Sequence, residues 1–274
     1  MTKENLDIDK TDFDIKLGLE YYIPSLLELI NGNIRWTSLK KILENKFNEY
    51  KERYNNGERF ELRVTLYSIC VSAAKGNTES KQFLYFIDNV FKSLANCLSA
   101  SEKTLIKENI TNLLEYRDGF LNYLGELCVL NSLMSSGFYR LEKTEYRLEK
   151  DRKGIDFKIT NIETNQSYLI EVVNIELRED KMTDHNLIQK FLTSKIQEKL
   201  NITDESGITE YTLIPVIWGG RDNVNNILKV KDFYEKTNFS IDRVETPRVY
   251  MQLKVEDKTI NRFGCILKCL NEYA

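Results

Sequence analysis

The hydrophobic pattern of this chain changes near residue 118, and the change divides the sequence into two parts. Before it, apolar residues recur at the three- and four-residue spacing of amphipathic helices, in stretches that end at glycines such as Gly57 and Gly76. Thr78 and Ser101 precede two further helical stretches and are suitable N-caps. No convincing strand pattern occurs in this part. We therefore predict a helical bundle domain over residues 1–118.

Residues 119–274 alternate between helical and strand-like patterns. A helical stretch that begins at Phe120 stops at Gly137. The elements predicted after it are strands in YRLEKTEYRL, GIDFKI and SYLIEVVNIEL, a helix over about 185–200, a strand in YTLIPVIW, a short helix near 223–236, a strand in VYMQLKV and a last helix near 258–272. The order helix, three strands, helix, strand predicts an α/β (α+β) fold with a mixed central sheet flanked by helices.

Composition excludes several classes of protein. The chain has 274 residues, of which 42% are hydrophobic, and this is enough material for a sizeable core. Its formal net charge of -3 gives no general basis for electrostatic attraction to nucleic acids or membranes. No apolar stretch approaches the roughly 18 residues of a membrane span, and the start MTKENLDIDK is too acidic for a signal peptide. We expect a cytoplasmic protein with no membrane partner.

The five cysteines are an odd number and are scattered along the chain, which favours free thiols, most of them buried, over disulfides. Cys265 and Cys269 have the spacing of neighbours on one helix face. No second cysteine pair accompanies them, and His185 is the single histidine. We therefore expect no zinc site.

Three acidic residues stand in surroundings that are otherwise apolar. Glu171 lies within YLIEVVNIEL, where residues of both parities are apolar, so both faces of this strand are expected to be buried. Asp156 lies on the less apolar face of GIDFKI, and Glu126 is the only charged residue between Phe120 and Gly137. An unpaired carboxylate in an apolar interior costs several kcal/mol, so a buried one must be neutralised, hydrogen-bonded or bound to a cation.

Taken singly, two of these acids have ordinary explanations. A half-exposed strand accounts for Asp156, and a salt bridge or a helix cap accounts for Glu126. Taken together, one acid on a buried helix and one on each of two adjacent strands can converge at one edge of a sheet. Oxygen ligands in that arrangement suit Mg²⁺ or Mn²⁺. Such an ion would offset the repulsion among the acids and activate a water for attack on phosphorus.

The second part of the chain resembles the PD-(D/E)XK nuclease superfamily, which has a restriction-endonuclease-like core. The family pattern is a helix with Gly-Glu, apolar residues and a glycine, then a strand with an aspartate, and then a strand that ends in apolar-Glu-x-Lys. GELCVLNSLMSSGF, GIDFKI and YLIEVVN fill these places within residues 119–220. The resemblance implies that Asp156 and Glu171 bind Mg²⁺ (or Mn²⁺) and that Val172 contributes its backbone carbonyl. It further implies that Glu126 orients a water or holds a second metal.

The position of the family lysine is occupied here by Val173, which cannot stabilise charge at a phosphate. Two lysines are candidates for a displaced cation. Lys158 shares the face of Asp156, about 6 to 7 Å along the strand, and is preferred. Lys195 lies inside the apolar stripe of the helix over residues 185–200. Lys199, at the edge of that stripe, illustrates that lysines at such positions also extend to solvent.

The resemblance implies a Mg²⁺-dependent nuclease that hydrolyses DNA (or RNA) through a metal-activated water, as a restriction or defence enzyme. Cleavage of duplex DNA would favour a homodimer, and residues 1–118 would serve a protein partner, the substrate or self-association. The basic run from Arg147 to Lys153 either lines a substrate groove or forms a solvated turn. Val173 supports the alternative of an inactive module for nucleic-acid binding or protein interaction. In a third interpretation the acids are structural, and the protein is an interaction scaffold.

Overall fold

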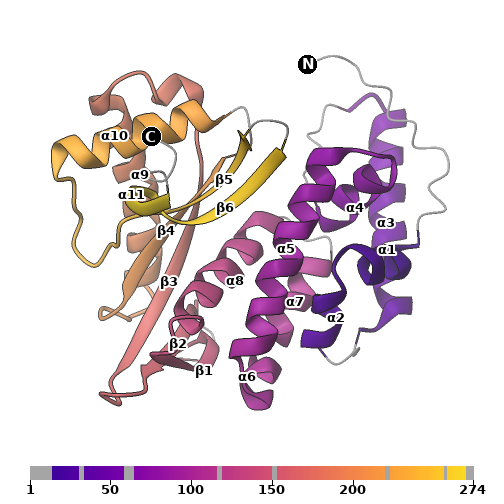
Figure 1. The fold of residues 1–274 in the computed structure, drawn as a ribbon, viewed down its shortest axis with the longest axis horizontal. Coiled ribbons are helices and arrows are strands. Elements are labelled where there is room, and N and C mark those ends of the chain that lie inside the picture. Colours follow the sequence, from indigo (N-terminus) through magenta and orange to yellow (C-terminus); the bar gives the residue numbers. More distant parts are fainter. Residues whose placement is uncertain are drawn as a thin grey trace. The chain divides into compact units, whose positions relative to one another are not determined.

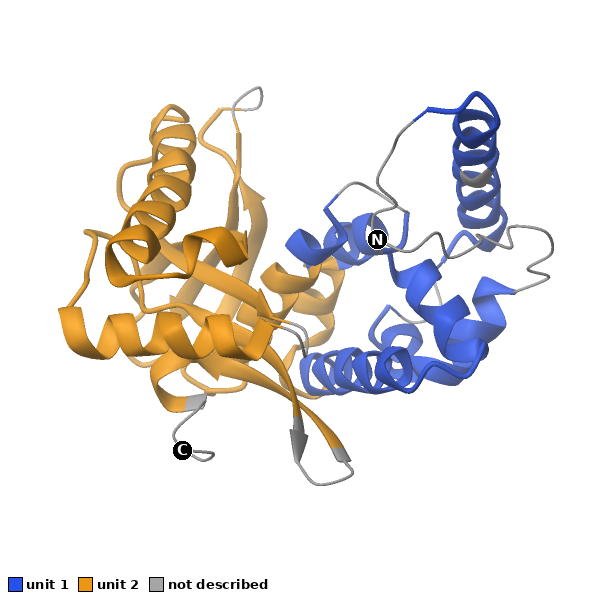
Figure 2. Cartoon of the chain, turned by 90° about the horizontal axis from the view of Figure 1, so that it is seen from above, with its two compact units in different colours: residues 1–95, 107–123 blue, residues 96–106, 124–274 orange. Residues whose placement is uncertain are grey.

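The structure is a computed structural model, and it describes residues 14–30, 34–58, 65–115, 119–149, 153–219, 223–255 and 258–269. Two compact units are present, one made of residues 1–95 and 107–123 and the other of residues 96–106 and 124–274 (Figure 2). The boundary predicted at residue 118 falls on a position outside the described residues. Among the described residues, no helix has the length and apolar character needed to cross a bilayer.

The N-terminal region is helical, as predicted. Its helices are α1 Ile15–Tyr22, α2 Pro24–Leu29, α3 Trp36–Asn55, α4 Leu66–Ala74, α5 Thr78–Cys97, α6 Ala100–Leu105 and α7 Lys107–Leu114. The predicted caps were each misplaced by a residue or two. The side chain of Asn77, not Thr78, accepts from the backbone of α5, and Ser99, not Ser101, forms a capping box with Glu102.

The second unit contains one six-stranded sheet, with the strands in chain order from β1 to β6 (Figure 1). The neighbours β1–β2, β2–β3 and β5–β6 are antiparallel, whereas β3–β4 and β4–β5 are parallel. The strands are β1 Tyr139–Tyr146, β2 Ile155–Asn161, β3 Ser167–Glu176, β4 Thr212–Gly219, β5 Arg248–Val255 and β6 Lys258–Cys265. The helices that accompany them are α8 Phe120–Met134, the 3-10 turn η1 Glu179–Lys181, α9 His185–Asp204, α10 Val224–Thr237 and α11 Ile266–Cys269. The predicted mixed sheet with interspersed helices is confirmed.

Helices cover both faces of this sheet. On one face, α9 and α10 pack their apolar stripes onto β3 and β4 in a core that includes Ile175, Ile196 and Ile217. On the other face, α8 approaches β3 so closely that a Cβ atom at Gly125 would overlap the side chain of Asn174. Residues 171 and 174 have opposite parity, so Glu171 points to the α9 face and Asn174 to the α8 face.

The edge strand β1 is covered by α6, which explains why residues 96–106 belong to the second unit. The backbone N–H of Leu141 donates to Glu102 Oε1 at 2.7 Å, and Thr144 Oγ1 donates to the carbonyl of Leu105 at 3.0 Å. These bonds occupy polar groups that an exposed sheet edge would leave open to another chain.

The predicted last helix near 258–272 was wrong for most of its length, because residues 258–265 form β6. Pairing with β5, from Val255↔Lys258 to Arg248↔Cys265, determines the structure of this stretch. Tertiary pairing of this kind overrides a short periodic signal. Among the described residues, Cys70, Cys97, Cys128 and Cys265 form no disulfide. Cys70 and Cys128 are buried as expected for most of the thiols, whereas Cys97 is exposed and Cys265 is half-buried.

Candidate active site

Asp156 and Glu171 face each other across β2 and β3 at the point where the ladder between these strands ends. The paired register runs from Thr160↔Ser167 to Phe157↔Ile170, and one further step places Asp156 opposite Glu171. Directly opposite residues on antiparallel strands share a face of the sheet. Two carboxylates therefore stand side by side where β2 and β3 separate.

The two carboxylates take over the hydrogen bonds that the backbone no longer makes. The N–H of Asp156 donates to Glu171 Oε2 at 3.1 Å, and the N–H of Val172 donates to Asp156 Oδ2 at 2.7 Å. Each acid thus binds the opposite strand. In an extended strand, the N–H and C=O of one residue point to the same neighbour. The carbonyl of Val172 is therefore directed into the gap that Asp156 occupies.

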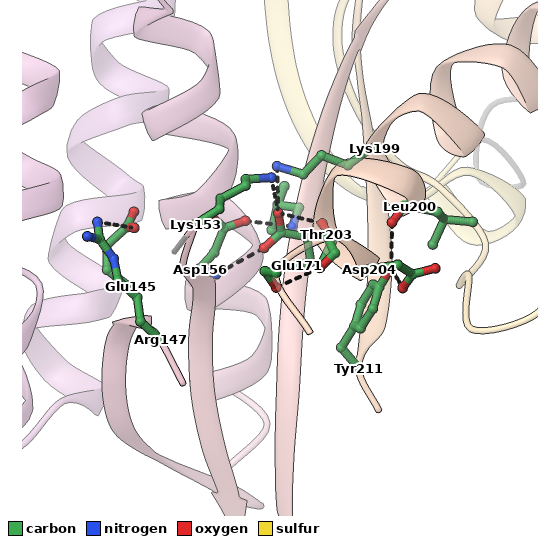
Figure 3. Close-up of polar contacts among 12 residues, drawn as sticks. Glu145, Arg147, Lys153, Asp156, Glu171, Lys199, Leu200, Thr203, Asp204 and Tyr211 are labelled. Carbon is green, nitrogen blue, oxygen red and sulfur yellow. Dashed lines mark hydrogen bonds and ion pairs between the residues drawn. The ribbon is translucent and has the colours of Figure 1, made fainter. Parts of the chain in front are cut away.

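Two lysines and a threonine converge on the remaining oxygen of Glu171 (Figure 3). Lys199 Nζ lies 2.7 Å and Lys153 Nζ 3.0 Å from Glu171 Oε1, and Thr203 Oγ1 donates to the same atom at 3.3 Å. Lys199 and Thr203 lie one turn apart on α9, whereas Lys153 lies two residues before the start of β2. The Glu171 side chain is 0% exposed. The two lysines offset the charge of the buried Glu171, and with Asp156 ionised the four charges sum to zero.

The pKa values of Asp156 and Lys199 are both raised, but for different reasons. Burial and the negative charge of Glu171 raise the pKa of Asp156 to about 7, although Lys199 and the hydrogen bond from Val172 oppose the rise. For Lys199, burial lowers the pKa, but the charges of Asp156 and Glu171 outweigh it and raise the pKa above its usual range. Lys199 therefore stays protonated near neutral pH and acts as a fixed positive charge, not as a base.

The raised pKa of Asp156 predicts a pH-dependent stability. An unfolded aspartate has a pKa of about 3.9, so between about pH 4 and pH 7 the folded protein binds more protons than the unfolded chain. The free energy of unfolding is therefore expected to fall as pH rises through this window in the absence of divalent ions. Urea unfolding at several pH values in EDTA measures the slope. Asp156→Asn is expected to flatten it, and an equal slope in both proteins would contradict this assignment.

A further acid, Glu145 near the end of β1, influences the pair, since its charge contributes to raising the pKa of Asp156. Its backbone φ of 48° lies in the left-handed region, which is uncommon for a residue other than glycine. Arg147 approaches its carboxylate at 3.7 Å, and a Cβ on Gly154 would lie 3.1 Å from its carbonyl carbon. Gly154, which precedes β2, thus allows the end of β1 to pass close to the acids.

The donor set suits a small hard cation, although it is not a complete cage. Asp156 and Glu171 contribute two carboxylates, and strand geometry directs the carbonyl of Val172, whose N–H contacts Asp156, to the same side. Mg²⁺ keeps several waters and is bound by one or two carboxylates, so these three groups fit it. Among the described residues, no three His, Cys, Asp or Glu side chains are grouped to hold a metal.

The other predicted site residues lie elsewhere in the second unit. Glu126 is buried on α8 beside Gly125, which packs against the opposite face of β3 from Glu171, and its role as a water-orienting or second-metal residue stays a prediction. Lys158 Nζ pairs with Glu142 at 3.1 Å, and Lys195 Nζ pairs with Glu198 at 3.5 Å. His185 opens α9 and contacts Asp232 at 3.0 Å, consistent with its expected place at a helix terminus.

Two lysines contact Glu171: Lys199, at the edge of the apolar stripe predicted for its helix, and Lys153, in the basic run before Asp156. Thr203 was not predicted. The available signal was the spacing of Lys195, Lys199 and Thr203 along one side of α9. Only the angle at which α9 crosses β3 decides which of these residues meets Glu171. Val173, the position of the family lysine, packs against the apolar core under α9 and α10.

No family model, curated protein or solved structure matches this chain.

Proposed function

We propose that this chain is a divalent-metal-dependent nuclease of PD-(D/E)XK type. In this proposal Lys199 on α9 takes the role of the family lysine, whose position is occupied by Val173. The observation that carries the proposal is the 2.7 Å contact between Lys199 Nζ and Glu171 Oε1. It places a permanently protonated amine beside the acid pair, from a different element of the core. The order α8, β1, β2, β3, α9, β4 supports the same restriction-endonuclease-like assignment.

The roles follow from the contacts. Asp156 and Glu171 hold the cation site together with the carbonyl of Val172, and the backbone bonds between β2 and β3 orient both carboxylates. Thr203 and Lys199 keep Glu171 in place. A bound Mg²⁺ supplies a Lewis acid and lowers the pKa of water. Lys199 contributes positive charge where a phosphate gains negative charge in the transition state.

A second function has its own support. Glu171 already accepts from Lys199, Lys153, Thr203 and the backbone of Asp156, so the cluster is satisfied by protein groups alone. A cluster that is satisfied in this way suits a protein that has the nuclease fold but no catalytic activity. Such a protein would serve as a nucleic-acid-binding or interaction module. A restriction or defence role, a homodimer and a protein partner for residues 1–118 belong to the first proposal as further predictions.

A cleavage assay tests the proposal directly. Purified protein with Mg²⁺ or Mn²⁺ is expected to cut DNA or RNA, presented in single-stranded and double-stranded form, and EDTA is expected to stop the reaction. Asp156→Ala removes one of the two carboxylates and is expected to lower the rate by about a hundredfold or more. Asp180→Ala is the matched control, because Asp180 is an exposed aspartate on η1 paired with Arg178 and Lys181. Intact substrates under all conditions, with no effect of Asp156→Ala, would favour the inactive module.

A further inference from the structure

A pocket of about 630 Å³ opens on the second unit beside the acid pair. We define the tyrosine pocket by Tyr146, Lys158, Leu169, Tyr211 and Arg243, which lie along its wall with Gln166. Its volume is within the usual range for sites that bind small molecules or single nucleotide units, roughly 300 to 1,000 Å³.

The tyrosine pocket adjoins the acids along the same face of the sheet. Lys158 lies two residues after Asp156 on β2, and Leu169 lies two residues before Glu171 on β3. Residues two apart on a strand share a face and are separated by about 7 Å. Tyr146 lines the same pocket, and Lys158 Nζ lies over its ring. A nucleic-acid strand with one phosphate at the acid pair would therefore place its neighbouring nucleotide at this pocket.

Two of the three tyrosines that line the pocket, Tyr146 and Tyr211, are each accompanied by a cation. Lys143 Nζ and Lys158 Nζ lie 5.7 and 5.8 Å from the centre of the Tyr146 ring, and the guanidinium of Arg243 lies 4.9 Å from that of Tyr211. Aromatic rings combined with Lys and Arg are the groups on which proteins stack the bases of single strands. Tyr211 is buried, with 6% of its surface exposed, so Arg243 covers its ring, and the half-buried Tyr146 is the ring that a base can reach.

The cations of the pocket are themselves balanced by acids. Arg243 binds Asp204 through two nitrogens at 2.8 and 3.0 Å, and Lys158 pairs with Glu142. A bare phosphate would gain little from such compensated charges. A flat, uncharged group that packs on rings and meets polar groups at its edge fits better, and a nucleobase has this chemistry.

Arg243 is held rigidly in an unusual backbone conformation. Its φ of 62° lies in the left-handed region, and its carbonyl accepts from the N–H of Leu213 at 2.7 Å. Its side chain also donates to the carbonyl of Thr209 at 3.1 Å. Strained positions that the surrounding structure enforces occur preferentially at binding and catalytic sites. The wall of the pocket is therefore ordered before any ligand arrives.

We infer that the tyrosine pocket receives an unpaired base next to the scissile phosphate, so the substrate is single-stranded nucleic acid. This inference rests on the proposed nuclease function. A chain with a net charge of -3 attracts phosphates only weakly as a whole, and stacking on a ring adds affinity of a different kind. A base within a duplex would first have to be unpaired and unstacked to enter.

Fluorescence anisotropy with labelled oligonucleotides tests the inference, using the full chain as Asp156→Asn to prevent cleavage. We expect this parent to bind single-stranded DNA or RNA more tightly than a duplex of the same sequence. Adding Tyr146→Leu is expected to weaken single-strand binding by about tenfold or more, whereas Tyr146→Phe keeps the ring and the affinity. Circular dichroism confirms that each variant is folded.

The outcomes separate the two proposals. If the parent binds single strands and folded Tyr146→Leu binds them equally well, or if the duplex binds more tightly, the pocket assignment is overturned while the nuclease proposal stands. If the parent binds neither DNA nor RNA in any form, and the unmodified protein cuts none, both are overturned.

Discussion

Lys199→Met is expected to lower the rate of phosphodiester cleavage by about 100- to 1,000-fold, as the loss of one preorganised charge or donor in an active site does. The methionine side chain has a similar length but no charge, so it leaves Glu171 paired with Lys153 alone. The effect should fall on kcat, because Lys199 acts where charge develops in the transition state. Steady-state kinetics with a labelled oligonucleotide measures it, and thermal unfolding confirms that the variant folds.

Lys195→Met is the matched control for this experiment. Lys195 is on the same helix, one turn before Lys199, but its side chain is 50% exposed and pairs with Glu198. Its replacement should change the rate by less than about twofold, as surface ion pairs contribute little. Equal activity of Lys199→Met and the unmodified protein would remove Lys199 from the mechanism. A large loss of activity in Lys195→Met alone would instead assign the role of the family lysine to Lys195, the candidate in the apolar stripe.

Glu171→Gln is expected to weaken the binding of Mn²⁺ or Mg²⁺ by at least about a hundredfold, because it removes a charged ligand in a buried position. Isothermal titration calorimetry measures the affinity, and the rise in melting temperature with Mg²⁺ gives a second readout. Glu198→Gln, at an exposed position on α9, should bind the ion as the unmodified protein does. Identical metal binding by Glu171→Gln would show that the acid pair is not the metal site.

Lys153→Met is expected to have the opposite effect on metal affinity. Lys153 is the more exposed of the two lysines on Glu171, at 38% against 21% for Lys199, and it precedes β2 instead of lying within a helix. It is therefore the ammonium group that a divalent ion would displace at the smallest cost. Without it, binding should tighten by about three- to tenfold, since one competing charge is gone. Weaker binding in Lys153→Met would mean that this lysine supports the site instead of competing for it.

The pairing of Asp156 with Glu171 could be anticipated from sequence, whereas the identity of the cation could not. An acidic residue in an apolar strand can be recognised in the sequence as a candidate site residue, because burial of a carboxylate without a partner is very costly. A lysine gives no comparable signal, since its long side chain reaches either solvent or a buried acid from the same helical position. Lys158 and Lys195 were reasonable choices by spacing, yet Lys158 pairs with Glu142 on the neighbouring strand and Lys195 with Glu198 on its own helix.

Sequence alone determined the helical N-terminal region, the order of elements from α8 to β4 and the place of both acids on adjacent strands. These features depend on the spacing of apolar residues and on the cost of burying a charge, and short stretches of sequence are enough to show both. The tertiary structure decided that residues 258–265 pair with β5 and do not form a helix, and that Lys199 reaches Glu171 from α9. The first outcome depends on hydrogen bonding to the preceding strand and the second on the angle at which α9 crosses β3, and the period of a single stretch encodes neither.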